Sequence, residues 1–217
     1  HVNKNIKDMV LNFDNIYIRP DIHLEDKNED GLSKLISNGS FVSFDPKFSY
    51  INGFVKSRHL DDKACAGILL YLADVLFNLT IQTEHNIYIF FNITEETGQG
   101  ISGFPTCDEV IAVDMGCVGN DLTGNEFSVS ICQMDSSGPY NYELTSNLTK
   151  LAQKNDINFK VDVFPFYSSD GAVVLRAGND AKVALIGPGI HASHGYERTH
   201  KLSLLNTFKL LLAYIRS

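Results

Sequence analysis

Short runs of β-branched and aromatic residues alternate with longer helical patterns from about Asn86 onwards. Strands are predicted at residues 87–93, 110–114, 127–132, 159–163 and 182–186. Helices are predicted at residues 63–79, 142–154, 172–177 and 202–215. Alternation of this kind is typical of strands that are joined by crossover helices, so the pattern predicts a three-layer α/β fold.

The predicted helix 63–79 is apolar on nearly every face, which favours a largely buried helix packed against the sheet. It starts directly after Asp61 and Asp62. An acidic residue at a helix start is first explained as a cap, because a carboxylate accepts hydrogen bonds from the free N–H groups there. Capping explains one of these aspartates more easily than it explains both.

The first sixty residues follow a different pattern. Short strand-like runs occur at 13–20, 39–44 and 50–55, and the first two are separated by the acidic, polar stretch 25–31. We interpret residues 1–55 as part of a small β-rich subdomain that starts in mid-fold. Residues 56–217 are then the main α/β domain.

Composition excludes several classes of protein. The net charge of -8 and the pI near 5.3 argue against nucleic-acid binding, which usually requires a basic face. Neither a run of 18 apolar residues nor a charged start followed by an apolar stretch is visible, so we expect a soluble, cytoplasmic protein with no membrane partner. The four cysteines form no CxxC pair, which makes a zinc ribbon or a thioredoxin-type site improbable.

Acidic or histidine motifs follow the predicted strands or open a predicted helix, where an open α/β sheet forms its ligand crevice. They are Leu-Asp-Asp-Lys at 60–63, Thr-Glu-Glu-Thr-Gly at 94–98, Val-Asp-Met at 113–115 and His-Ala-Ser-His-Gly-Tyr-Glu at 191–197. Taken singly, each motif is most simply a solvated turn or a helix cap. Together they indicate a site.

Glu95 and Glu96 follow an apolar run that we expect to be a central strand. Adjacent like charges beside a core cost free energy unless a cation or a proton compensates them. Carboxylates with imidazole, and without thiolate pairs, suit zinc, manganese or cobalt. Two such ions can polarise a carbonyl and activate water together, and a separate carboxylate is then needed to shuttle the proton.

The order of these motifs resembles that of the glutamyl and tetrahedral aminopeptidases of metallopeptidase family 42. The run Ser-Ser-Asp-Gly-Ala at 168–172 is similar to the family's Gly-Thr-Asp-Ala turn, and residues 39–48 and 52–58 look like its small β subdomain. The resemblance implies a phosphorylase/hydrolase-like α/β/α zinc-peptidase domain. It further implies two divalent metal ions, peptide substrates, a homo-oligomer, and removal of N-terminal residues through a metal-activated water.

Carried over residue by residue, the resemblance implies that Asp61 bridges the two ions, while Asp62 supports the ligands from outside their shell. Glu95 is then the general base, and Glu96 binds the second metal. Asp114 binds the first metal. These roles are expectations that come from the resemblance.

His194 is the expected last ligand of the second metal, because the family places a histidine shortly before a glutamate here and Glu197 supplies the latter. The family commonly has four residues from histidine to glutamate, whereas this chain has three. His191 and His200 therefore remain alternatives.

The family's first-metal histidine lies in a His-x-Asp motif ahead of the β subdomain. Only His59-Leu60-Asp61 has these letters here, and it already contains the expected bridging aspartate. We therefore expect a fragment that binds about one zinc and is inactive by itself. The alternatives are a non-catalytic or differently specific metallo-hydrolase, such as an amidohydrolase or deacylase, and a metal-free α/β binding domain.

Overall fold

The computed structural model describes residues 10, 12, 17–23, 30–79 and 81–217. The chain divides into two compact units, residues 1–43 and 44–217. In the first unit the described residues include one short helix, α1 (Asp30–Leu35). Residues 13–16 of the expected run 13–20 lie outside the described residues, and residues 17–20 and 39–44 form no strand. The division predicted at residue 55 stays a prediction.

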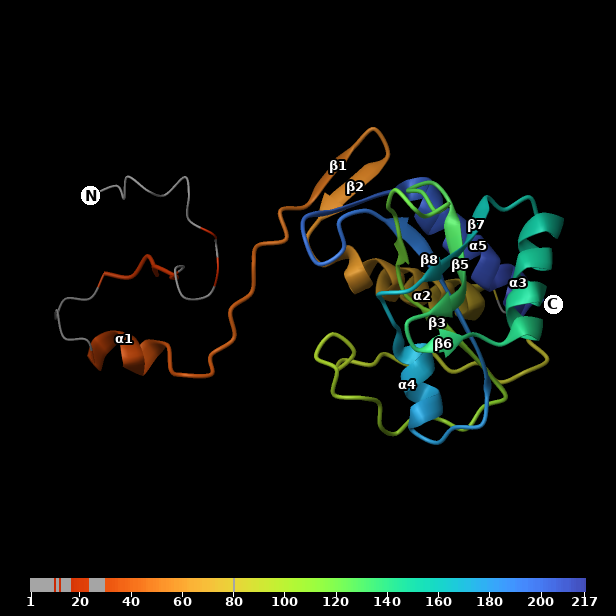
Figure 1. The fold of residues 1–217 in the computed structure, drawn as a ribbon, viewed down its shortest axis with the longest axis horizontal. Helices are drawn as coiled ribbons and strands as arrows, with labels where there is room; N and C mark the ends of the chain where they lie inside the picture. Colours follow the sequence, from red (N-terminus) through yellow and green to blue (C-terminus); the bar gives the residue numbers. More distant parts are fainter. Residues whose placement is uncertain (1–9, 11, 13–16, 24–29, 80) are drawn as a thin grey trace. The chain divides into compact units, whose positions relative to one another are not determined.

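The second unit is built on a mixed six-stranded sheet (Figure 1). Its central path runs in the order β3 (Glu109–Val113), β8 (Lys182–Ile190), β5 (Val129–Asp135) and β6 (Gly138–Pro139). Two further strands attach to this path, β4 (Gly116–Cys117) to β8 and β7 (Phe159–Phe164) to β5. The β3–β8 and β5–β7 pairs are parallel, whereas β5 pairs with β8 in the antiparallel direction.

Helices cover both faces of this sheet, which gives the predicted three-layer α/β fold. The main core joins the sheet to α2 (Leu60–Asn78), α3 (Tyr142–Lys154) and α5 (Lys201–Ile215). Ile131 and Ile186 belong to that core, whereas their neighbours Cys132 and Leu185 point to the opposite face, as alternate strand residues do. On that opposite face α4 (Asp170–Arg176) packs close to β8.

The expectation that helix 63–79 is largely buried against the sheet is wrong. Cys65, Ile68 and Leu72 of α2 are buried, but Leu70 and Phe77 are 62% and 85% exposed. In the described part of the chain α2 packs on the sheet and α5 along one side only. Because α2 is apolar on nearly every face, the side that neither the sheet nor α5 covers exposes apolar residues.

The prediction of a central strand at residues 87–93 is also wrong. Residues 81–108 form neither helix nor strand, and Ile93 is 92% exposed. The β-branched and aromatic residues of the run favour a strand only where a partner strand supplies the ladder. The edge of the described sheet is instead β3.

A small antiparallel sheet connects the start of α2 to the histidine-rich segment. It has the order β1 (Ser49–Ile51), β2 (Phe54–Ser57) and β9 (Glu197–His200). Asn52 and Gly53 make its hairpin turn with φ values of 52° and 84°, the left-handed region that Asn-Gly turns favour. Because Ser57 pairs with Glu197, the residues after β2 lie beside those before β9.

None of the described helices is both long and apolar enough to cross a membrane.

Candidate metal centre

Glu197 joins the two segments that carry the first candidate ligands. This side chain is 2% exposed, and its carboxylate accepts hydrogen bonds from Asp61 N at 3.0 Å and from His194 N at 3.1 Å. His194 has a φ of 62°, a backbone region that few non-glycine residues adopt and that is enriched at functional sites. Ser193 Oγ donates to Asp61 Oδ2 at 2.8 Å. One buried carboxylate thus holds Asp61 and His194 side by side.

Asp61, Glu96 and His194 form what we call the histidine cluster. His194 Nε2 lies 3.4 Å from Asp61 Oδ2 and 3.5 Å from Glu96 Oε2. Bonds of about 2 Å to one tetrahedral ion place ligand atoms roughly 3.3 Å apart. The two distances from His194 match this spacing, and one ligand atom from each of the three side chains lies within 4.8 Å of the others.

Asp61, Asp62 and Asp114 form a second group, the aspartate cluster, in which one oxygen of each lies within 4.8 Å of the others. The peptide bond between Asp61 and Asp62 is cis. Asp62 Oδ1 is buried and has no hydrogen-bond partner among the described residues, whereas Asp114 Oδ1 accepts from Met115 N at 2.6 Å. The two clusters share Asp61, so one carboxylate can bridge two ions.

Burial raises the pKa of two carboxyls in this site, those of Asp62 and Asp114. It raises the pKa of Asp62 to about 9, with the nearby charge of Asp114 adding to the effect. It raises the pKa of Asp114 well above its ordinary value, with Asp61 contributing next. Among the described residues, no lysine, arginine or histidine lies within ion-pair distance of Asp62 or Asp114, and His194 alone lies within this distance of Asp61 and Glu96. Crowded carboxylates with one imidazole and no lysine or arginine partner fit divalent cations.

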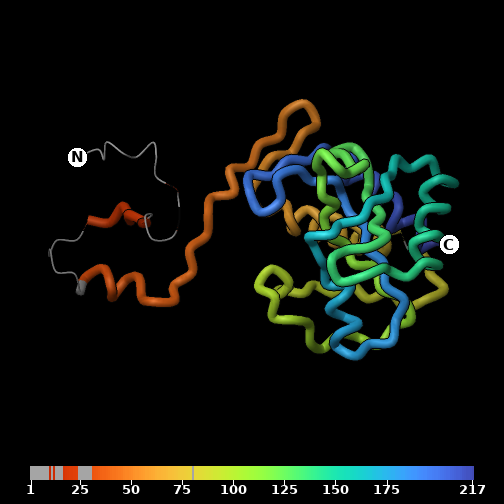
Figure 2. Tube along the Cα trace, in the orientation of Figure 1, coloured from red at the N-terminus to blue at the C-terminus, as the bar shows by residue number. Residues whose placement is uncertain are grey.

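A hydrogen-bonded turn places Glu95 and Glu96. Asn92 Nδ2 donates to Gly100 O at 3.2 Å and to Asp170 Oδ1 at 2.8 Å, and Asn92 Oδ1 accepts from the backbone and hydroxyl of Thr94. We call these contacts the Asn92 clasp. Asp170 lies at the start of α4, so the clasp ties the loop 81–108 to that helix. Figure 2 shows the yellow-green trace of this loop beside the light-blue trace of α4.

Glu95 stands apart from both clusters, although it lines the same cavity. It is half-buried, and burial raises its pKa to about 7, with the neighbouring charge of Glu96 as the second cause. A carboxyl with a pKa near 7 can accept and release a proton at neutral pH. Burial also raises the pKa of Glu96, and the charge of Asp61 adds to it.

The structure places the two alternative histidines elsewhere. His200 is buried, caps α5 by accepting from Leu202 N at 3.2 Å, and packs its ring against Phe54. His191 is exposed and pairs with Arg198 through the backbone. Neither belongs to a possible metal-binding group among the described residues. Of the three histidines near residues 191–200, His194 is the one that the fold brings to the carboxylates.

A cavity of about 370 Å³ opens beside the clusters. Part of its wall is acidic, with Asp61, Glu95, Glu96 and Asp114. The remainder is mostly apolar or aromatic and comprises Met115, Cys117, Phe164, Phe166, Tyr167 and Leu185 together with Gly98, Ser168, Asp135 and His194. The candidate ligands therefore border a space that can hold a small organic group.

Sequence reasoning missed the residues that hold the ligands in place. In the sequence, Glu197 marked only the position of the neighbouring histidine, and no pattern identified Ser193 or Asn92. Their contacts join residues that lie 136, 132 and 78 positions apart in the chain. A local sequence pattern contains no signal for such pairs.

Comparison with known proteins places these features in a family. A family model described as M42 glutamyl aminopeptidase matches residues 1–210. The Bacillus subtilis (strain 168) protein named "Putative aminopeptidase YhfE" is 43% identical over 223 residues, covering 100% of this chain and 63% of its own length. The chain thus spans less than two thirds of that relative.

Solved structures share the fold. The aminopeptidase APDkam598 of Desulfurococcus kamchatkensis superposes with a TM-score of 0.72 at 19% identity, covering 88% of this chain and 57% of its own. The TET1 peptidase of Pyrococcus horikoshii gives a TM-score of 0.63 at 22% identity, with 77% and 52% covered.

Proposed function

The chain belongs to the M42 glutamyl aminopeptidase family, and we propose that its acidic cleft supplies most of the active site of a metal-dependent aminopeptidase. The observation that carries the proposal is the pair of clusters that share Asp61. The substrates are peptides, from which the N-terminal residue is removed. A protein that only binds ligands needs no proton acceptor here, so Glu95 beside the clusters favours the enzyme.

The donor sets indicate which residues hold metal. The histidine cluster combines two carboxylates with an imidazole and suits zinc, and manganese or cobalt are alternatives. In the aspartate cluster the proposed ligands are the carboxylates of Asp61 and Asp114, so this group holds its ion less tightly unless a further ligand joins it. When bound, two divalent ions polarise the carbonyl of the scissile bond and make water a better nucleophile at neutral pH.

Glu95 is the general base of the proposed reaction. Its carboxylate takes a proton from the attacking water and, once protonated, returns a proton to the departing amine. The half-buried position keeps Glu95 accessible from the cavity and outside both clusters. Asp62, buried next to Asp61, acts by orienting its neighbour and by offsetting positive charge. Ser193 and Glu197 orient Asp61 and His194.

A homo-oligomer is part of the proposal. The Pyrococcus horikoshii TET1 peptidase can assemble into a tetrahedron or a large octahedral shell. This chain has exposed apolar side chains on α2, including Leu70, Tyr71 and Phe77, which are suited to a subunit contact. The expected cytoplasmic location stays a prediction.

Two isosteric variants test the proposal in the full-length protein. Glu95→Gln should keep the zinc content and lower the turnover of an aminoacyl p-nitroanilide by about 100-fold to 10,000-fold, because it removes only the proton acceptor. Glu96→Gln should also lower the zinc affinity, because it removes a ligand. Zinc content and turnover are measured on the same samples. Equal zinc loss in both variants contradicts the assigned roles, and turnover that is unchanged by Glu95→Gln contradicts the mechanism.

A further inference from the structure

One wall of the cleft contains no candidate metal ligand. Met115, Cys117, Phe164 and Leu185 belong to this part of the lining, and so does Asp135, which pairs with Phe164 where β5 and β7 lie side by side. Phe164 and Leu185 are 3% and 4% exposed, so they are firmly packed from behind. An apolar wall that carries one carboxylate resembles a pocket for a side chain with an apolar stem and a polar end.

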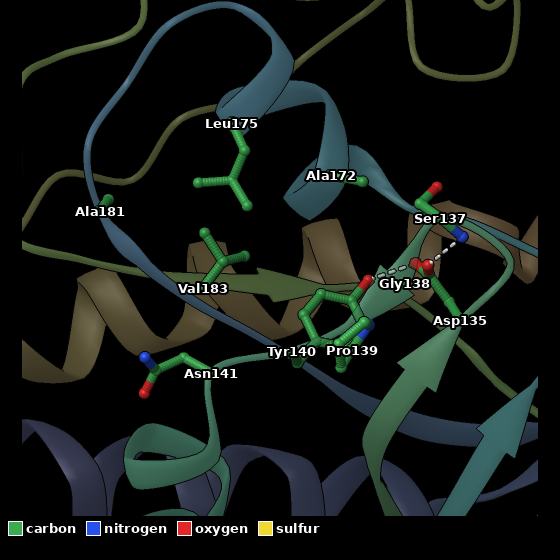
Figure 3. A pocket seen from close by; sticks show the side chains of 10 residues that line it. All are labelled: Asp135, Ser137, Gly138, Pro139, Tyr140, Asn141, Ala172, Leu175, Ala181 and Val183. Atoms are coloured by element: carbon green, nitrogen blue, oxygen red, sulfur yellow. Dashed lines mark hydrogen bonds between the residues drawn. The ribbon is translucent and has the colours of Figure 1, made fainter.

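Asp135 is held rigidly at the end of β5. It is 3% exposed, its Oδ1 accepts from Ser137 N at 2.7 Å, and its Oδ2 accepts from Tyr140 OH at 2.5 Å. Tyr140 OH in turn lies 2.9 Å from Ser169 Oγ. Figure 3 shows Asp135, Ser137 and Tyr140 at a second cavity of about 250 Å³, so Asp135 borders both cavities. Each carboxylate oxygen has two acceptor positions, and the single donor at each oxygen of Asp135 leaves room for another.

The charges around the cleft discriminate between substrate side chains. In the described part of the chain, five carboxylates and no lysine or arginine line this cavity. Divalent ions held by the clusters offset the charge of Asp61, Glu96 and Asp114, whereas Asp135 and the proposed base Glu95 belong to neither cluster. A glutamate or aspartate side chain that enters the pocket meets a like charge without a partner cation. A lysine or arginine side chain brings both the apolar stem and the cation.

We propose that the cleft selects peptides with an N-terminal lysine or arginine, that it excludes N-terminal glutamate and aspartate, and that Asp135 determines this choice. The proposal rests on the function proposed above, because it assumes that the N-terminal residue of a peptide occupies the cleft. It is opposite to the preference that the word glutamyl in the family description suggests.

Binding of three amino-acid hydroxamates to the zinc-loaded protein tests the proposal without requiring turnover. Lysine, norleucine and glutamate hydroxamate share the α-amino and hydroxamate groups, so affinity differences report the side chain alone. Calorimetry should show that lysine hydroxamate binds about 10-fold to 100-fold tighter than norleucine hydroxamate, as a charge-assisted hydrogen bond provides. Glutamate hydroxamate should bind more weakly than both.

Two aspartate variants locate the cause. Asp135→Asn should remove the advantage of lysine over norleucine and leave norleucine affinity within about twofold. The matched control is Asp162→Asn, because Asp162 is also a buried strand aspartate, accepts from two backbone N–H groups, and does not line the cleft. The control should keep the preference for lysine.

The outcomes separate this inference from the proposed function. Glutamate hydroxamate that binds as tightly as lysine hydroxamate overturns the inference, even if Asp135→Asn fails to fold, because this comparison uses the unmodified protein. A lysine preference that survives in folded Asp135→Asn also overturns it. Equal binding of all three ligands refutes the selectivity alone. No binding of any of them refutes both the selectivity and the proposed cleft.

Discussion

The metal-free chain should lose stability as the pH rises, and Asp62 is one of the two buried carboxyls that cause the loss, with Asp114 as the other. Its pKa is raised from an ordinary 3.8 to about 9. A raised pKa in the folded state means that the folded protein holds the proton more tightly than the unfolded chain does. The stability from this proton is fully present below about pH 4 and is lost progressively as the pH rises through about 9. Asp62→Asn supplies a neutral side chain of the same shape at every pH.

The magnitude follows from the size of the shift. About five pKa units at roughly 1.4 kcal/mol each give an upper limit near 7 kcal/mol. Water entry and proton sharing with Asp114 reduce this limit, so we expect about 2–4 kcal/mol between pH 5 and pH 8.5. That is a large part of the roughly 5–15 kcal/mol that stabilises a typical domain.

Urea unfolding in EDTA at these two pH values measures the effect. Relative to the unmodified chain, Asp62→Asn should gain about 2–4 kcal/mol in free energy of unfolding between pH 5 and pH 8.5. Asp74→Asn is the control, because Asp74 is an exposed aspartate on the same helix. The reasoning is refuted if the metal-free chain is as stable at pH 8.5 as at pH 5, or if Asp62→Asn shows the same loss.

Three further predictions concern how the ligands are held. The 217-residue chain should bind about one zinc ion tightly in a calorimetric titration and should hydrolyse anilides slowly or not at all. His194→Ala should lower the zinc affinity at least about 10-fold. Two tight zinc sites in the titration would contradict this prediction. Asn92→Ala should remove the hydrogen bonds of the Asn92 clasp and lower the zinc affinity about 10-fold to 100-fold in the same titration. Asn78 is an exposed amide on α2, so Asn78→Ala should leave the zinc affinity unchanged. Gly187→Ala should lower the Tm by about 5 °C or more in a thermal melt, since its Cβ would lie 1.6 Å from Asp114 O; an unchanged Tm would show that the site relaxes freely.

Local signals predicted most regular elements of the second unit. Residues 142–154 were predicted as a helix and form α3 with the same limits, because Asn141 caps its start and apolar residues recur at helical spacing. The strand 182–186 is real but continues to Ile190. Gly187, Pro188 and Gly189 discourage a strand prediction, yet here the two glycines allow the close approach of Asp114 and Asn125.

The remaining features depend on contacts between distant segments. The run 87–93 has strand-forming residues but no pairing in the described sheet, and its last residues are instead fixed by the Asn92 clasp. The apolar residues of α2 do not reveal which of its faces the fold covers. The motif residues were identifiable because carboxylates and histidine carry recognisable chemistry. The residues that hold the motif side chains in place, such as Glu197, are of types that are common on any protein surface.

The crowding that weakens the metal-free chain is the same property that makes the site bind cations. Asp61, Glu96 and His194 come from three segments that meet only in the complete fold of the second unit. A ligand set that is absent from the unfolded chain contributes its binding free energy to folding. Bound cations replace the protons that otherwise neutralise the carboxylates, so zinc should stabilise the chain more at pH 8.5 than at pH 5. Asp62→Asn removes one of the charges that a cation would offset, so the variant that is more stable without metal should gain less from zinc.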